Sequence, residues 1–167
     1  MILETIDKMT FSLLSNEKVV NASLKYTTTA FDDAALNTSE KYILSGIGIG
    51  SWIIHNYSGR SAKVNSKIKV EVGGIMSITM QFPRRKFIMK KSAGWKLRFS
   101  LGTKEGEDFL TLIPSVNWKK ESYDYILQLN DEFEAECDSF LILQAVHCAN
   151  CSLSMMTGGR VPALVSI

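Results

Sequence analysis

The chain has 167 residues, 46% of them hydrophobic and 22% charged, and a formal net charge of +2 at pH 7. This length allows one domain to bury a core without disulfide bonds or metal, and the composition excludes an intrinsically disordered chain. The longest apolar run, 42–54, is too short to span a membrane, and the N-terminus lacks the apolar region of a secretory signal.

Alternation of apolar and polar residues, which is typical of half-buried strands, recurs along the chain. In segment 19–30, for example, Ala22 and Leu24 share one face while Ser23 and Lys25 share the other. The same alternation predicts strands in segments 63–72, 75–82, 95–101, 109–113, 123–129 and 132–137. Segment 139–147 is apolar enough to predict a strand that is buried on both faces.

The pair Gly73-Gly74 separates segments 63–72 and 75–82 and predicts a hairpin. In the first of these segments Ile68 and Val72 are expected to point inward, and the lysines between the apolar positions outward. The basic segment that follows the hairpin is expected to form a loop before the strand at 95–101.

Helix is plausible only in segment 29–37 and in part of segment 38–54, although each glycine in the second would cost about 1 kcal/mol in a helix interior. We therefore expect a mainly β fold, a single-domain β-sandwich or barrel over residues 1–167. It would contain about eight short antiparallel strands and one or two short helices. Its tail, 158–167, would either pack on its own domain or act as an arm that is exchanged between copies.

Charge is distributed unevenly along the sequence. Residues 60–98 hold eleven basic side chains and one acidic side chain, a net charge of +10, whereas residues 1–59 carry −2 and residues 99–167 carry −6. Such asymmetry indicates an anionic partner or self-association through opposite charges, unless folding mixes the segments.

Ten residues of this basic region are candidates for anion binding, because clustered Lys and Arg side chains attract phosphate groups of nucleic acids and lipid headgroups alike. Phe87, Ile88 and Met89 lie among them, and they would stack on bases, enter a headgroup layer, or face the core. The alternative is an ordinary solvated strand face. The candidates are Lys63, Lys67, Lys69, Arg84, Arg85, Lys86, Lys90, Lys91, Lys96 and Arg98.

His147 lies close in sequence to all three cysteines, Cys137, Cys148 and Cys151. These four side chains could bind zinc or provide a Cys–His nucleophile pair, but their spacing is poor for either, and the buried-core alternative is favoured. Segment 46–51, GIGIGS, lacks the spacing of a phosphate-binding loop. We therefore predict no metal, no cofactor and no catalytic residue, and the odd cysteine count favours a reducing, intracellular setting.

The resulting expectation is a non-enzymatic structural protein that binds an anionic partner, lipid headgroups or nucleic acid, and assembles into a homo-oligomer. Small viral matrix, coat and movement proteins share these properties as a class, which suggests a location at a membrane periphery or in a viral particle. One alternative is a monomeric module that binds a ligand or a protein. A second is a small enzyme or zinc protein centred on His147.

Overall fold

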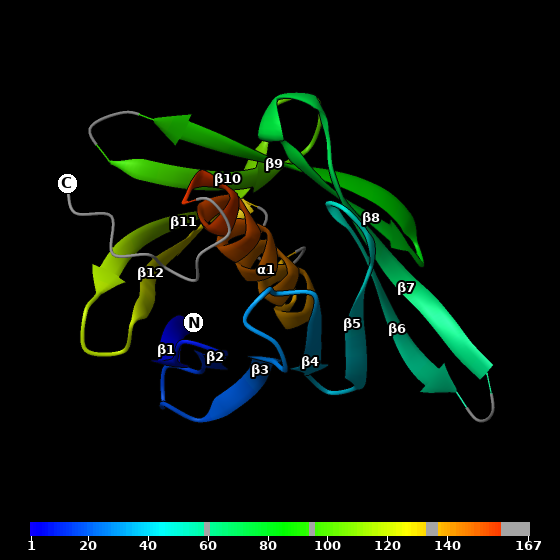
Figure 1. Cartoon of the computed structure of the whole chain (residues 1–167), viewed down its shortest axis with the longest axis horizontal. Coiled ribbons are helices and arrows are strands. Elements are labelled where there is room, and N and C mark those ends of the chain that lie inside the picture. Colours follow the sequence, from blue (N-terminus) through cyan, green and yellow to red (C-terminus); the bar gives the residue numbers. More distant parts are fainter. Residues whose placement is uncertain (59–60, 94–95, 133–136, 158–167) are drawn as a thin grey trace.

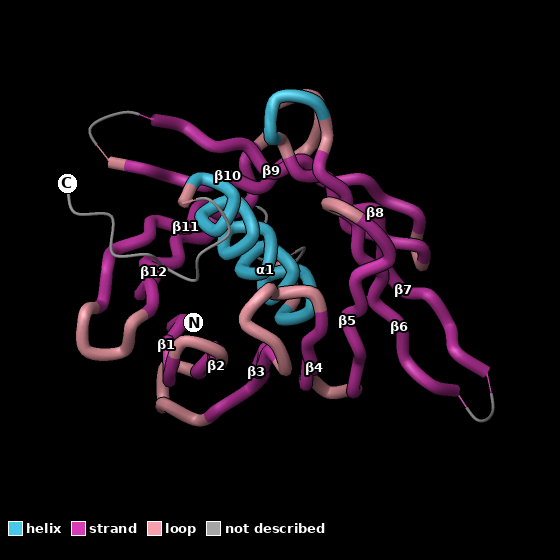
Figure 2. The backbone as a smooth tube through the Cα atoms, in the orientation of Figure 1, coloured by secondary structure: helices cyan, strands magenta, loops and turns pink. Residues whose placement is uncertain are grey.

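A computed structural model of the chain describes residues 1–58, 61–93, 96–132 and 137–157. In this part of the chain, twelve antiparallel strands surround one α-helix (Figures 1 and 2). The strands are β1 (Ile2–Asp7), β2 (Thr10–Leu14), β3 (Val20–Tyr26), β4 (Asp33–Asn37), β5 (Lys41–Gly48), β6 (Ser51–Ser58), β7 (Ser61–Val70), β8 (Met76–Gln81), β9 (Arg84–Ala93), β10 (Leu97–Gly102), β11 (Asp108–Asn117) and β12 (Ser122–Leu129).

Each strand pairs with the next strand in the sequence, so the sheet is an up-and-down meander that curls into a nearly closed barrel. The first and last strands meet at the remaining seam. There the Thr5 hydroxyl donates a hydrogen bond of 2.7 Å to the Tyr123 carbonyl, and the Lys120 ammonium donates to the Thr5 carbonyl. The expectation of a mainly β barrel is confirmed, but there are twelve strands rather than about eight.

The main correction concerns segment 139–147, which is not a strand. It belongs to α1 (Ser139–Met156), the helix that runs through the middle of the barrel (Figure 1). The Asp138 carboxylate caps the helix by accepting a hydrogen bond of 2.7 Å from the Leu141 N–H. The barrel wall surrounds this helix and buries every residue from Phe140 to Leu153, so its sequence shows no strong amphipathic period to distinguish it from a buried strand.

By length and composition alone, α1 could cross a membrane, since its mean hydropathy is 1.3 over 18 residues. In the structure, 78% of that window is buried inside the barrel. The same apolar character is needed to fill a barrel interior, so burial by protein accounts for it.

The two segments considered for helix are also strands. Segment 29–37 contains β4, and segment 38–54 contains β5 and the first half of β6. Gly50 forms the turn between β5 and β6 with a φ of +65°, a conformation that favours glycine. The predicted strand at 132–137 falls largely on residues outside the described ranges, as does the proposed arm at 158–167.

The core consists of inward side chains of the sheet packed around the helix. Phe11, Leu24 and Ile54 from the wall are almost fully buried, as are Leu143 and Val146 from the helix. Burial of this much apolar surface, at about 25 cal/mol per Å², is the dominant stabilising contribution. It fixes which strand faces point outward, and therefore which charged side chains can meet a partner.

Candidate anion-binding surface

Strands β7, β8, β9 and β10 are consecutive neighbours in the barrel wall, and together they carry most of the candidate basic residues. The predicted β7–β8 hairpin is present, closed by a single turn of 3₁₀-helix at Val72–Gly74. Both Gly73 and Gly74 have positive φ, 79° and 75°. The segment expected to be a basic loop is instead β9, which pairs with both β8 and β10.

Because β9 is a strand, its side chains alternate between the two faces of the sheet. Phe87 and Met89 point into the barrel and are buried, with exposures of 3% and 2%. These two are therefore core-facing and not available to bases or lipids, whereas Ile88, between them, lies on the outward side and is half-buried. Lys86 and Lys90 alternate with them and point outward.

The outward cations lie in register across the strands. Lys67 on β7 pairs with Thr79 on β8, and Thr79 pairs with Lys86 on β9. Further along, Lys90 on β9 pairs with Ser100 on β10. Neighbouring strands lie about 4.8 Å apart, so these cations are separated by roughly a Debye length or less at physiological salt. Their fields therefore add.

We call this surface the basic face and define it by six exposed residues on the outward side of three strands. No acidic residue occurs within β7, β8, β9 or β10, so the cations are not offset by carboxylates on the same strands. The members of the basic face are Lys67, Lys69, Arg84, Lys86, Lys90 and Arg98.

Glu71, which follows β7, is an acidic residue that contacts this surface. Its carboxylate accepts hydrogen bonds from the Ser77 hydroxyl at 2.8 Å and from the Lys86 ammonium at 3.2 Å. These two hydrogen bonds hold the pKa of Glu71 below its usual value. Glu71 thus stays ionised and offsets part of the charge of Lys86.

The other four candidates do not belong to the basic face. A register shift opposite Ile54 and His55 places Lys63 on the other side of the sheet from Lys67, with its Nζ 4.0 Å from the centroid of the Phe82 ring. Arg85 and Lys91 alternate with the outward residues of β9, and the Arg85 guanidinium lies 5.4 Å from the centroid of the Phe87 ring. Lys96 is exposed just before β10.

Sequence reasoning overlooked the hydroxyl groups between the cations. Ser77 and Thr79 occupy the outward positions of β8, between the lysines of β7 and β9. Their outward direction could have been predicted from the sequence, because these residues alternate with the buried Met76 and Ile78. The Ser77 hydroxyl is covered and donates to Glu71, whereas the Thr79 hydroxyl can donate to phosphate oxygens, as the flanking ammonium groups can.

The His147 and cysteine cluster is in the core, on α1 and at its start. His147, Cys148 and Cys151 are buried, and the one-turn spacing of His147 and Cys151 brings the Cys151 Sγ within 3.5 Å of the His147 Nε2. The Tyr26 hydroxyl lies 3.1 Å from the His147 Nδ1. Among the described residues, no three His, Cys, Asp or Glu side chains are arranged to hold a metal ion.

Burial keeps these groups neutral. Desolvation lowers the pKa of His147 to about 3 and raises the pKa of the Cys148 thiol. A second buried polar residue, Asn150, links the barrel wall to the helix: it accepts from the Tyr125 hydroxyl at 2.7 Å and donates to the Tyr26 hydroxyl at 3.3 Å. The cluster therefore has the properties of a hydrogen-bonded core.

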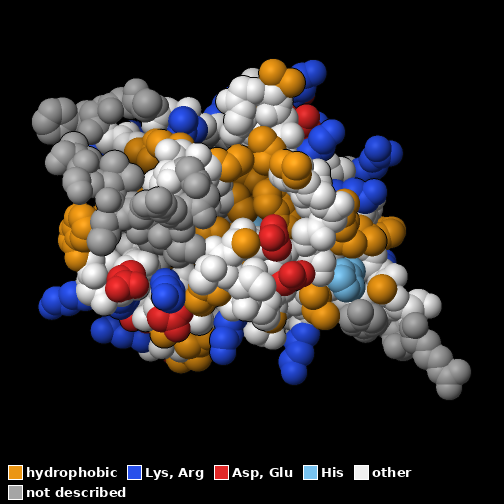
Figure 3. Space-filling view, in the orientation of Figure 1, with side chains coloured by type: hydrophobic (Ala, Val, Ile, Leu, Met, Phe, Trp, Pro, Cys, Tyr) orange, Lys and Arg blue, Asp and Glu red, His pale blue; other side chains and the backbone are white. Residues whose placement is uncertain are grey.

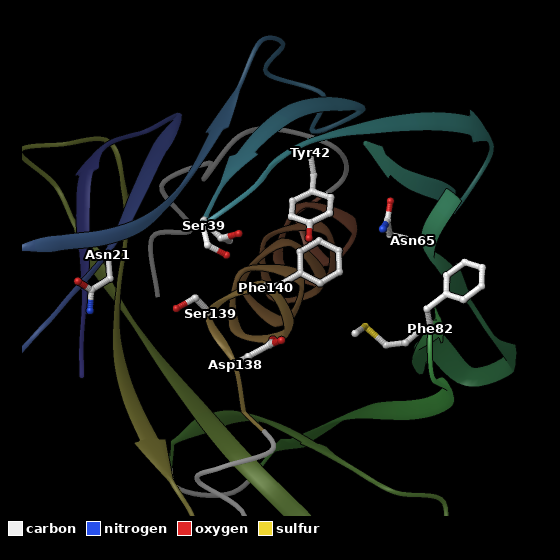
Figure 4. A pocket seen from close by; sticks show the side chains of 10 residues that line it. Asn21, Ser39, Tyr42, Asn65, Phe82, Asp138, Ser139 and Phe140 are labelled. Carbon is white, nitrogen blue, oxygen red and sulfur yellow. The ribbon is translucent and has the colours of Figure 1, made fainter. Parts of the chain in front are cut away.

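A separate cavity lies at the end of the barrel where α1 begins (Figure 4). Its volume is about 420 Å³. Tyr42 stacks on Phe140 with ring centroids 4.2 Å apart, and Asn65 and Ser139 provide polar groups. Desolvation raises the pKa of Tyr42 to about 12, and its hydroxyl donates to the Glu40 carboxylate at 3.1 Å. The combination of aromatic rings with amide and hydroxyl groups suits a small polar ligand.

Together these features define a twelve-stranded antiparallel barrel around a buried helix, with a basic face on one part of its wall. Comparison of the chain with family models, curated proteins and solved structures found no match.

Proposed function

We propose that this is a non-enzymatic protein that binds an anionic partner, lipid headgroups or nucleic acid, through the basic face. The observation that carries the proposal is the placement of six outward cations on strands that contain no acidic residue. A surface of this kind attracts a phosphate-bearing partner by Coulomb attraction and by release of its counterions. Arg84 and Arg98 can in addition bind phosphate oxygens in a bidentate manner.

The state of the core supports a non-enzymatic role. An enzyme centred on His147 would need an imidazole that exchanges protons with substrate near neutral pH. His147 is fully buried, and desolvation lowers its pKa to about 3. The Cys148 and Cys151 thiols are buried beside it, and burial disfavours the thiolate that would act as a nucleophile or zinc ligand.

Self-assembly is the second part of the proposal. The basic face can meet acidic residues of another copy, such as Glu105 and Glu107 in the β10–β11 turn, which are exposed. Contacts between two different surfaces of identical chains build rings, lattices or filaments. A small viral matrix, coat or movement protein, intracellular and peripheral at a membrane or within a particle, is the class to which we assign it by analogy.

A monomeric ligand-binding module is the second candidate function, because the cavity beside Tyr42 and Phe140 offers aromatic surface together with amide and hydroxyl groups. This combination is suited to a small polar ligand with one flat face. Replacing Tyr42 by Ala would abolish binding of such a ligand, measured by calorimetry, and would leave binding to anionic partners unchanged.

The main proposal is tested by neutralising the basic face. The variant changes five of its six residues to Gln and keeps Arg84, so that it matches a five-residue control: Lys67, Lys69, Lys86, Lys90 and Arg98. This neutralised variant should bind oligonucleotides or anionic vesicles more weakly. The slope of log affinity against log salt concentration should also become shallower, by about one unit for each phosphate that the protein no longer neutralises. The matched control changes five exposed lysines elsewhere to Gln, and it should keep most of the binding: Lys8, Lys25, Lys41, Lys104 and Lys119. Equal losses in both variants would place the binding site elsewhere.

A single substitution that increases the net positive charge of the same surface provides a second test. Glu71→Gln removes the carboxylate that is hydrogen-bonded to Lys86. Binding to the anionic partner should become tighter, and its salt dependence steeper, because one more ammonium group is free to contact phosphate. Unchanged affinity across the salt series would contradict a role for Lys86.

A further inference from the structure

Two turns at one end of the barrel expose large aliphatic side chains almost completely. Ile49 in the β5–β6 turn is 106% exposed, and Val72 in the β7–β8 turn is 95% exposed. Val72 is expected from the sequence to point inward, but β7 ends at Val70 and the chain leaves the barrel wall before residue 72. Among the described residues, none covers either side chain.

The two turns lie side by side. The Val70 N–H donates a hydrogen bond of 2.8 Å to the Gly50 carbonyl, and a Cβ built on Gly50 would lie 2.9 Å from a Val70 methyl group. Ile75, from the same β7–β8 turn, lines a groove with Met155 and Met156 at the end of α1. We call this set of exposed aliphatic residues the apolar rim: Ile47, Ile49, Val72, Ile75, Met155 and Met156.

Most turns at the opposite end of the barrel, in the described part of the chain, have a different character. Alternate turns of an antiparallel meander lie at the same end, so the β2–β3, β4–β5 and β10–β11 turns are far from the rim. Their tips are polar or charged and include Glu17, Ser39 and Glu105. Phe82, in the β8–β9 turn, lies against the Lys63 ammonium. The opposite end also exposes Val19, Val20 and Phe82, so the rim is distinguished by its groove at the end of α1 and not by exposed apolar residues alone.

Cations border the rim. Lys90 and Lys91 line the groove that contains Ile75 and the two methionines, a space of about 450 Å³. Figure 3 shows this end of the barrel, with hydrophobic side chains gathered in a hollow below the β7–β8 turn and Lys and Arg side chains along the neighbouring margin. Acidic side chains appear below the hollow in the same view (Figure 3). In the β3–β4 turn, at the same end of the barrel, the Asp32 carbonyl accepts a hydrogen bond of 2.7 Å from the Gly46 N–H. This separation of basic from acidic side chains favours binding of an anionic partner on the side of the barrel formed by β7–β10.

We propose that the apolar rim is a membrane-docking site for an anionic lipid bilayer, a proposal that rests on the proposed function and identifies its partner. Ile49 and Val72 enter the boundary between headgroups and acyl chains, while Lys69, Lys90 and Lys91 contact lipid phosphates. Partial burial of aliphatic side chains together with attraction of lysines to anionic lipid is the way peripheral proteins hold to membranes.

The chemistry of the rim favours lipid over nucleic acid. Proteins that bind single-stranded nucleic acid stack bases on aromatic side chains beside their cations. The six rim residues are isoleucine, valine and methionine, and Trp118, an exposed aromatic residue in the β11–β12 turn at the same end, is not among them. Contact with a hydrated phosphate backbone does not remove aliphatic side chains from water, so it does not stabilise the complex. Insertion into the acyl region of a bilayer does remove them from water, and it therefore provides hydrophobic binding free energy.

The test uses the intact chain with Ile49→Ser and Val72→Ser, alone and combined, and vesicles of phosphatidylcholine with or without equimolar phosphatidylserine. Each substitution should lower the partition coefficient on the anionic vesicles by about tenfold. The matched control is Val19→Ser with Val20→Ser, which are 58% and 59% exposed at the opposite end of the barrel. This control should bind like the unmodified chain. All four sites are exposed, so the fold should be unaffected.

The outcomes separate the two proposals. Vesicle binding that survives removal of the rim but is abolished by neutralising the basic face would overturn the docking site and leave the proposed function standing. Binding to oligonucleotides without binding to vesicles would also overturn the docking site and leave the proposed function standing, and it would identify the partner as nucleic acid. Binding to neither would overturn both. A fluorophore on Ile49→Cys that shifts to the blue on anionic vesicles, with no shift from Val20→Cys, would support insertion directly.

Discussion

His147 is a single buried residue through which the stability of the core depends on pH. The ring is enclosed by the barrel, with the Trp52 ring edge-on at a centroid distance of 5.0 Å and the Tyr26 hydroxyl at 3.1 Å from Nδ1. Because burial disfavours the imidazolium, the folded protein holds His147 neutral down to about pH 3, whereas in the unfolded chain it takes up a proton near its ordinary value of 6.5.

The free energy of unfolding should therefore fall as the pH falls below 6.5, the pKa of His147 in the unfolded chain. Between about pH 6.5 and pH 3 the unfolded chain binds one proton more than the folded chain at this site, so the contribution of His147 to stability decreases by up to about 1.4 kcal/mol per pH unit. Urea unfolding at a series of pH values should show this slope, and His147→Gln should remove it. His55→Gln, on β6, controls for removal of an imidazole. An unchanged slope in His147→Gln would contradict the assignment.

At the scale of elements, turns and bulges decide where the outward charges lie. A register shift at the end of β10 brings Gly102 opposite Asp108. A Cβ at Gly102 would lie 1.8 Å from the Glu107 carbonyl oxygen, so no side chain fits without displacement of the backbone. Gly102 therefore allows the β10–β11 turn to pack closely against β10, one of the strands of the basic face.

Gly102→Ala should destabilise the protein by at least about 3 kcal/mol, the range of a severe steric clash with backbone. The matched control is Gly48→Ala, since a Cβ there meets no atom within 4 Å and the backbone is not in the left-handed region. Chemical unfolding monitored by circular dichroism measures both. A destabilisation in Gly102→Ala no larger than that in Gly48→Ala would show that the turn can move.

At the scale of the molecule, charge asymmetry predicts association that depends on salt. The basic face has no acidic residue on its strands, while the segment 99–167 carries a net charge of −6. The attraction between copies acts over about 30 Å at 0.01 M salt and about 3 Å at 1 M.

Light scattering should therefore give a larger mass at low salt than at high salt. The variant with a neutralised basic face should remain at the smaller mass throughout. A mass that is independent of salt in the unmodified chain would exclude assembly through these charges. Because the variant changes only exposed positions, its circular dichroism spectrum should match that of the unmodified chain.

The sequence by itself determined the class of the fold, six of its twelve strands, the Gly73-Gly74 hairpin and the outward direction of Lys67 and Lys69. These features follow from local alternation of side chains and from turn chemistry, which a short window of sequence records. The sequence also located the basic region, because charge is additive along the chain.

Only the tertiary structure decided the remaining features. Closure of the sheet made the apolar segment 139–147 part of a central helix, because a helix buried on all sides and a strand buried on both faces have the same composition. The bulge on β7 turned Lys63 away from Lys67, and pairing of β9 sent Phe87 into the core. The apolar rim arose from the packing of two turns and a helix end that lie far apart in sequence, a juxtaposition that no local pattern encodes.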